Sequence, residues 1–248
     1  MYLVTAAHVA RKLEGHRSAI RANTKDGGST VFWIPENLKW IYHAMTPDLV
    51  DVAVIPWSPP EVIQYKHLPS SLFLTEETIR SKSIGTGDEV FLTGLFAHLT
   101  GTTRNLPIVR MGSIAMMPSE PVPSSLGDIE AYLIEARSIG GLSGSPVFVR
   151  ETIPLGTGAF HLLGLMHGHW DIPPEAKNDN ADVEDLDGLG ENAGSVNMGI
   201  AIVVPAKKVW EVLNHPEQIQ KRREAADEYR RTHQPTLDEA GTTKQPGT

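Results

Sequence analysis

The chain has 248 residues, of which 40% are hydrophobic and 21% charged, and its net charge is −8 at neutral pH. This length allows one large β domain or two small ones, and the composition is that of an ordinary globular protein. The negative charge argues against nucleic acid and anionic membrane surfaces as partners. The sequence contains no cysteine, which excludes disulfides, a cysteine nucleophile and cysteine-based zinc sites.

The sequence carries no segment that predicts insertion into a membrane or secretion. No run approaches the roughly 18 apolar residues that read as a spanning helix. The N-terminus does not have a basic region followed by an apolar region and a cleavage site. From these features we expect a cytoplasmic location and no membrane partner.

The first part of the chain contains short apolar runs typical of strands. Residues 2–5 predict a strand, residues 6–10 the start of a helix, and residues 31–34 and 40–43 two further strands. Residues 58–86 are mixed in character and contain several proline and glycine turn signals, so they predict a connection between two halves of the protein.

Strand-like runs resume after this connection, at residues 89–93, 107–110, 131–135, 161–169 and 196–204. A helix with proline in its first turn is predicted at 205–213. Many short strands with few helices favour an all-β barrel or sandwich. Two polar segments stand apart: residues 171–195, with eight acidic side chains and one lysine, predict a solvated loop, and residues 214–248 predict a charged helix and a disordered tail.

One stretch, residues 138–149, combines glycines and serines with a following apolar run. Glycines allow a tight turn that points successive N–H groups into one space. A serine held in such a turn can present its hydroxyl beside donors for a developing oxyanion, as acyl transfer requires. Ser143 is the candidate nucleophile in this stretch, and the alternative is a simple turn before a buried strand.

Two upstream residues complete a candidate catalytic set. His8 is preceded by two small alanines, and Asp51 begins an apolar strand-like run, where a buried carboxylate needs a partner. The chain order is therefore His8, Asp51, Ser143, which is the order of the worked His-Asp-Ser template on a double β-barrel. The α/β-hydrolases have the order Ser, Asp, His and need glycine two residues after the nucleophile, where this chain has Ser145.

The motifs at these positions resemble those of the trypsin-like (chymotrypsin-fold) serine peptidases, in their bacterial cysteine-free form. Residues 5–8 match the TAAH motif of the family, and residues 51–54 its Asp-apolar-Ala-apolar strand. Residues 141–146 resemble the GxSGGP motif, with Ser145 in place of the second glycine. Residues 163–166 resemble the strand that lines the substrate cleft. The resemblance covers residues 1 to about 213 and ends with the closing strand and C-terminal helix.

The resemblance implies a serine endopeptidase that acts through an acyl-enzyme intermediate on a polypeptide substrate and needs no cofactor. Ser143 is then the nucleophile, His8 the general base and later the acid, and Asp51 the partner of His8. The N–H groups of Gly141 and Ser143 form the oxyanion hole.

The resemblance also implies an all-β double barrel with a C-terminal helix. We expect an N-terminal half at residues 1–84, a C-terminal half with its closing helix at 85–213, and a tail at 214–248. Seven residues precede His8, fewer than in the family, so we expect an N-terminally truncated chain whose first barrel lacks its first strands.

The expected substrate pocket is walled by Arg137 and Ser138 on one side and by His167 and His169 on another. A basic residue stands where trypsin-like enzymes carry an aspartate, so the sequence predicts a preference for acidic side chains. His167 and His169 could alternatively hold a metal, because alternate residues share a strand face. No third ligand is evident, and we predict no metal.

Two other functions remain open from the sequence. A catalytically silent protease-like module would use the same cleft to bind peptides or partner proteins. An esterase-like hydrolase would share the triad but lack peptide turnover. Active-site acylation separates the silent module from both enzymes.

Overall fold

The structure is a computed structural model that describes residues 1–96, 99–136, 141–151, 158–172 and 196–233. It divides the chain into two compact units, Met1–Val212 and Leu213–Thr248. The first unit is built mainly of β-strands and contains the candidate catalytic residues. Most of the predicted acidic loop and the predicted disordered tail lie outside the described residues.

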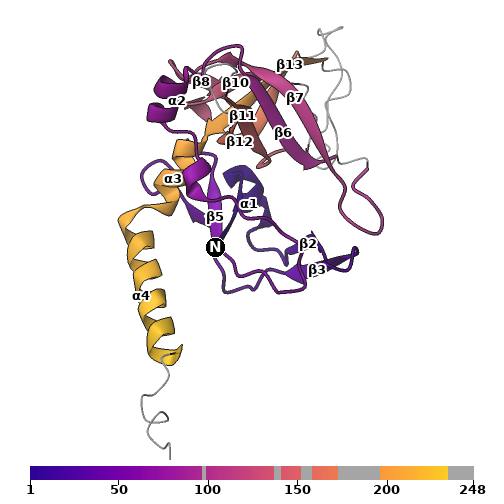
Figure 1. The fold of residues 1–248 in the computed structure, drawn as a ribbon, viewed down its shortest axis with the longest axis vertical. Helices are drawn as coiled ribbons and strands as arrows, with labels where there is room; N and C mark the ends of the chain where they lie inside the picture. Colours follow the sequence, from indigo (N-terminus) through magenta and orange to yellow (C-terminus); the bar gives the residue numbers. More distant parts are fainter. Residues whose placement is uncertain (97–98, 137–140, 152–157, 173–195, 234–248) are drawn as a thin grey trace, which may run out of the picture. The chain divides into compact units, whose positions relative to one another are not determined.

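Strands of the first unit close into a barrel in which hydrogen-bonded neighbours are antiparallel (Figure 1). Around the barrel the order is β10 (Tyr132–Glu135), β13 (Val196–Pro205), β12 (Phe160–Ile172), β11 (Pro146–Arg150), β6 (Glu89–Leu95) and β7 (Pro107–Met116). Leu92, Ile134 and Leu163, all nearly inaccessible to solvent, belong to its aliphatic core. Because closure leaves no unpaired edge, the barrel is a firm base for the site.

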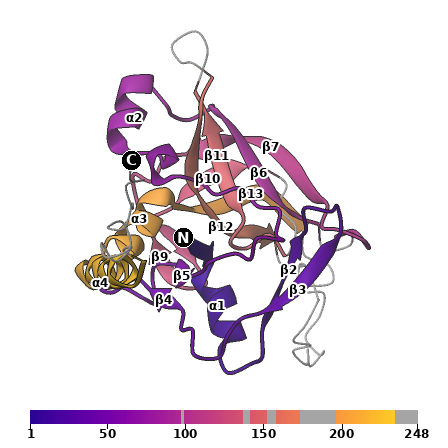
Figure 2. The same ribbon diagram turned by 60° about the horizontal axis from the view of Figure 1, so that its bottom comes forward.

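The N-terminal strands form open sheets. β1 (Tyr2–Thr5) and β4 (Ile41–Tyr42) both pair with β5 (Ala53–Pro56), and β2 (Ala19–Asn23) forms a separate hairpin with β3 (Ser29–Trp33). Helix α1 (Ala7–Leu13) lies beside this sheet (Figure 2). Its Ala7 and Ala10 are fully buried in one cluster with Ala53. These small side chains let the helix approach β5 closely, which brings His8 next to the residue that precedes the strand.

The connection between the two halves contains more regular structure than the sequence predicted. It includes a 3₁₀ turn, η1 (Ser70–Leu72), and the helix α2 (Glu76–Lys82). Thr75 Oγ1 accepts a hydrogen bond from the N–H of Thr78 at 3.1 Å and so caps α2. A threonine N-cap followed by two glutamates is a local helix signal, which the prediction of a plain connection missed.

Polar contacts join the β2–β3 hairpin to the segment between β6 and β7. Arg21 Nη1 donates to the carbonyl oxygen of Gly101 at 2.9 Å. The side chain of Asn105 donates to the carbonyl oxygen of Arg21 at 2.8 Å, and the side chain of Asn23 donates to the carbonyl oxygen of Asn105 at 3.0 Å. The hairpin is thus attached to this segment partly by hydrogen bonds that involve its backbone.

The remaining elements follow the barrel strands. A small hairpin, β8 (Val122–Ser124) with β9 (Gly127–Ile129), lies between β7 and β10 in the chain. Helix α3 (Ala206–Leu213) directly follows β13 and buries Val209 and Val212, and α4 (Pro216–His233) belongs to the second unit. Neither α3 nor α4, nor any other described helix, has the length and apolar character needed to span a membrane.

The predicted all-β architecture with a C-terminal helix is confirmed. The predicted strands in both halves are present, and the structure adds β2, β8 and β9. The closed barrel begins at Glu89, after the boundary expected at residue 84. The division into 1–84, 85–213 and 214–248 stays a prediction.

Candidate active site

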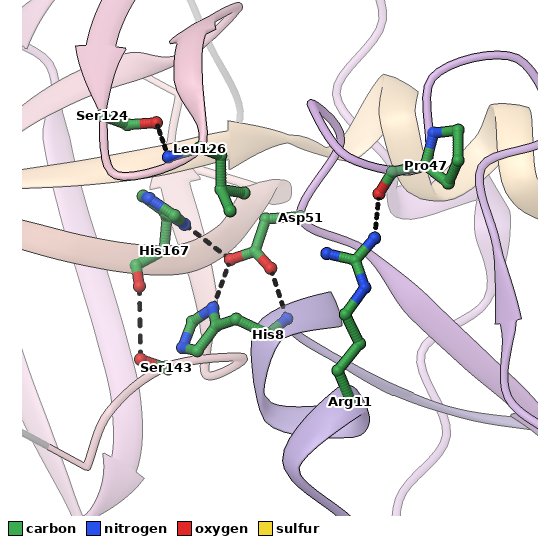
Figure 3. A network of polar contacts seen from close by, with 8 residues as sticks. All are labelled: His8, Arg11, Pro47, Asp51, Ser124, Leu126, Ser143 and His167. Carbon is green, nitrogen blue, oxygen red and sulfur yellow. Dashed lines mark hydrogen bonds and ion pairs between the residues drawn. The ribbon is translucent and has the colours of Figure 1, made fainter. Parts of the chain in front are cut away.

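Asp51 and His8 form a doubly bonded pair. Asp51 lies immediately before β5 and is 1% exposed. Its Oδ2 is 2.8 Å from Nδ1 of His8, and its Oδ1 accepts a hydrogen bond from the backbone N–H of His8 at 2.8 Å (Figure 3). Because an ionised carboxylate only accepts, Nδ1 of His8 carries the proton and Nε2 has the free lone pair. This is the tautomer that a general base needs.

A second histidine bonds to the same oxygen of Asp51. Nδ1 of His167 lies 2.6 Å from Oδ2, and the His167 ring meets the His8 ring edge-on with centroids 5.7 Å apart. The pairing of β12 with β13 shifts register between Met166 and Gly168, so His167 stands at a bulge. A bulge re-aims a side chain out of the regular strand alternation, and here the side chain reaches Asp51.

The surroundings of Asp51 favour its ionised form. Burial is the largest influence and opposes ionisation, but the hydrogen bonds from His167 and then from His8 outweigh it. Together they hold the pKa of the Asp51 carboxyl well below its usual range. The site therefore carries a fixed negative charge between two imidazole rings at neutral pH.

Ser143 lies in the turn before β11, next to this pair. Its Oγ donates to the backbone carbonyl oxygen of His167 at 3.2 Å. Between the described residues, no hydrogen bond joins Ser143 to His8. The structure thus brings three candidate residues to one place, with the serine hydroxyl turned to the backbone of β12.

The turn is pinned to both parts of the first unit through Gly144. Its N–H donates to the carbonyl oxygen of Met166 at 2.8 Å. Its φ is +79°, and an added Cβ would lie 2.5 Å from Thr5 Oγ1 and 2.8 Å from the backbone nitrogen of Ala6. Only glycine fits this close approach in a left-handed conformation. The Ser143 turn is therefore packed directly against the segment that leads into His8.

Ser145, the rival nucleophile, faces elsewhere. A Cβ added at Gly94 of β6 would lie 2.6 Å from Ser145 Oγ, so this hydroxyl packs against the barrel strand. Its N–H donates to the carbonyl oxygen of Leu142 at 3.0 Å. This placement favours Ser143 over Ser145 as the reactive serine.

The backbone at Gly141 and Ser143 is compatible with an oxyanion hole. Gly141 has a φ of +90°, a conformation that favours glycine. Among the hydrogen bonds between described residues, none uses the N–H of Gly141 or of Ser143. Because residues 137–140 are not described, the oxyanion hole stays a prediction.

A cleft of about 580 Å³ opens beside the two histidines of the network. It is lined by His8, Lys12, Pro123, Ser124, Ser125, His167, Gly168, His169 and Ile202. His169 therefore faces the cleft, as does the edge of His167, whereas the main body of the His167 ring is buried. The other predicted wall residues, Arg137 and Ser138, lie outside the described residues.

The network has the composition of a metal site, because one ligand atom each from His8, Asp51 and His167 lie within 4.8 Å of one another. The nitrogen–oxygen distances of 2.6 and 2.8 Å are those of direct hydrogen bonds, with a proton on each Nδ1. These two protons satisfy the carboxylate, so we interpret the network as hydrogen-bonded rather than metal-binding.

Two features of the site were missing from the sequence analysis. The contact of His167 with Asp51 depends on a bulge, for which the sequence has no local signal. Lys12 could have been found, because it lies four residues after His8 and a helix places such residues on one face.

No protein-family model and no curated protein matches the sequence. Among solved structures, the protease domain of MamO from Magnetospirillum magneticum has a TM-score of 0.50 and 17% identity, over 86% of this chain and 83% of that one. This likeness shows the fold. The chain has the chymotrypsin-like serine-protease fold, as predicted, with its N-terminal strands in open sheets.

Two other structural matches are weaker. The HtrA-type protease AlgW with decapeptide has a TM-score of 0.47 and 19% identity over 86% of this chain, which spans about half of AlgW (47%). A chymotrypsin from Cellulomonas bogoriensis has a TM-score of 0.38 and 12% identity, over 83% of this chain and 79% of that one.

Proposed function

We propose that this chain, which has the chymotrypsin-like fold, is a serine endopeptidase with Ser143 as nucleophile. The observation that carries the proposal is the buried Asp51 carboxylate bonded to Nδ1 of His8, with the turn of Ser143 packed against the helix that holds His8. A serine hydroxyl is a weak nucleophile alone and needs an adjacent oriented base.

The reaction follows from the roles of these three groups. Ser143 Oγ attacks the carbonyl carbon of the scissile peptide bond while Nε2 of His8 takes the hydroxyl proton. The His8 imidazolium, stabilised by Asp51, then gives this proton to the leaving amine, and the acyl-enzyme ester remains. Water hydrolyses the ester with His8 again as the base. For the first step, the Ser143 hydroxyl turns from the His167 carbonyl oxygen to Nε2 of His8.

The developing oxyanion is assigned to the N–H groups of Gly141 and Ser143. Donors fixed before the reaction stabilise the tetrahedral intermediate without reorganisation. Supporting this assignment, the neighbouring N–H groups of Gly144 and Ser145 already donate to Met166 and Leu142.

We further propose that the substrate carries an acidic side chain near the scissile bond. Lys12 and His169 line the cleft, and no carboxylate is among its lining residues. Arg137 adds a positive charge close to the nucleophile in sequence. Cleavage of a peptide library after Lys, Arg or large apolar residues, with no preference for acidic ones, would contradict this specificity.

A catalytically silent peptide-binding module is the second candidate, and one observation favours it. The Ser143 hydroxyl is bonded to the His167 carbonyl oxygen instead of to His8. In an active enzyme this hydroxyl must be free to turn, whereas in a silent module it stays in place.

The deciding experiment is the intact mass of the protein after treatment with a fluorophosphonate, which acylates an activated serine. We expect one adduct in the unsubstituted chain and none in Ser143→Ala. Ser145→Ala, the matched control, should still react. No adduct in the unsubstituted chain would favour the silent module, and turnover of esters without turnover of peptides would indicate an esterase.

A further inference from the structure

The second histidine on Asp51 has no part in the mechanism above. Nδ1 of His167 is nearer to Oδ2 than Nδ1 of His8 is, and the His167 side chain is 6% exposed against 30% for His8. We propose that His167 is a positioning residue that shares one carboxylate oxygen with His8 and thereby sets the proton affinity of His8. The proposal rests on the proposed function, in which His8 is the base.

His167 fixes the Asp51 carboxylate from the side of the closed barrel. Two of the three hydrogen bonds on this carboxylate come from His8 in α1, and the third comes from His167 in β12. α1 belongs to the open N-terminal part, whereas β12 is held between β11 and β13. Without His167, the orientation of Asp51 depends on α1 alone.

The shared oxygen also divides its charge between two donors. A hydrogen bond from His167 reduces the charge that Oδ2 offers to a protonated His8. If both rings became imidazolium, one carboxylate would face two cations whose Nδ1 atoms lie within 4.8 Å. The other charged or titratable groups near His167 in the described chain, Lys12 from α1 and His169 from β12, add positive charge. The two rings therefore titrate as a coupled pair that takes up one proton before the second.

The test measures the rate of fluorophosphonate acylation between about pH 5 and about pH 9, across the range in which histidine titrates. In His167→Ala we expect the plateau rate to fall about 10- to 100-fold through misplacement of Asp51 and His8. Its acid limb should move to higher pH, because Oδ2 then serves His8 alone. His167→Gln keeps a donor to Asp51, so its plateau should stay within about threefold of the unsubstituted chain. His67→Gln, an exposed histidine of the connection, controls for the loss of an imidazole.

A second readout follows the protonation of His8 by NMR of nitrogen-15-labelled histidine, which needs no catalysis. We expect the His8 midpoint to rise in His167→Gln, where the competing cation is gone, and to rise further in His167→Ala. An unchanged midpoint in both variants, or an unchanged plateau in His167→Ala, would overturn the proposal. If the alanine variant fails to fold, the NMR midpoint in His167→Gln decides. If the unsubstituted chain forms no adduct, the proposed function fails, and the His8 titration still tests the coupling.

Discussion

The closed barrel and the open N-terminal part are stabilised in different ways. The barrel buries large aliphatic side chains, such as Ile134 and Leu163, in one continuous core. The packing of α1 on its sheet rests on three alanines, Ala7, Ala10 and Ala53, with partly buried aromatic neighbours. Burial stabilises in proportion to apolar area, so the barrel is expected to be the more stable region.

The candidate catalytic residues are divided between these regions. His8 and Asp51 come from the open N-terminal part, and Ser143 and His167 come from the barrel side. They meet where Gly144 packs on Thr5 and where His167 bonds to Asp51. The site thus depends on the junction more than on either region. Substitutions should separate effects on the barrel from effects on the junction.

The largest expected effect on stability comes from the barrel core. Leu163 is fully buried, and Leu163→Ala removes its contacts and leaves a cavity. We expect a loss of about 2–5 kcal/mol in the free energy of unfolding, measured by denaturant titration. Leu99→Ala is the control, because Leu99 is 66% exposed and should cost less than about 0.5 kcal/mol. Equal losses in the two variants would contradict the assignment of the core.

The junction should respond most strongly to Gly144→Ala. The added methyl group collides with Thr5 and Ala6 and forces a left-handed φ on alanine. We expect the rate of fluorophosphonate acylation to fall about 100-fold, because the Ser143 turn is displaced from His8. Gly87→Ala is the matched control: its φ is +94°, and nothing lies within 4 Å of the new methyl group. It should cost about 1 kcal/mol of stability and leave acylation unchanged. Similar acylation in both variants would show that the close approach is unimportant.

The charge of Asp51 predicts a pH-dependent stability of the junction. Its pKa is lowered on folding, so the unfolded state binds more protons below about pH 4, the ordinary value. The stabilisation is fully present above that pH and is lost as the pH falls toward the lowered pKa. We expect Asp51→Asn to cost about 1–3 kcal/mol at neutral pH.

Denaturant titrations from about pH 7 to about pH 2 test this dependence. The stability difference between Asp51→Asn and the unsubstituted chain should shrink below about pH 4. A difference that stays constant with pH would mean that the asparagine variant loses packing instead of a charge.

The smallest expected effect concerns the exposed side of the cleft. Lys12→Gln removes a positive charge that lines the cleft beside His8. We expect kcat/KM for a peptide with an acidic residue to fall about two- to fivefold at low salt, with the difference reduced as salt screens the charge. A peptide with glutamine in place of the acidic residue is the control and should show no change.

The local patterns of the sequence were sufficient for much of the fold. Alternating and continuous apolar runs located β1, β6, β10 and β13, and the composition of residues 205–213 located α3 within one residue. The hairpin β2–β3 was predicted only in its second strand, because residues 19–23 have a mixed charged and apolar pattern. Helix α2 was missed although Thr75 and the following glutamates form a start signal.

What the sequence by itself determined was the set of chemical groups and their order: His8, Asp51 and Ser143 in chain order, with glycines around the serine. It also determined the class of fold, because strand patterns arise from local apolar spacing. Only the tertiary structure decided that His167 bonds to Asp51, that Ser145 faces Gly94, and that the Ser143 hydroxyl rests on the β12 backbone. These contacts depend on a bulge in strand pairing and on close packing between distant segments. Both are properties of the closed barrel as a whole, which no short stretch of sequence contains.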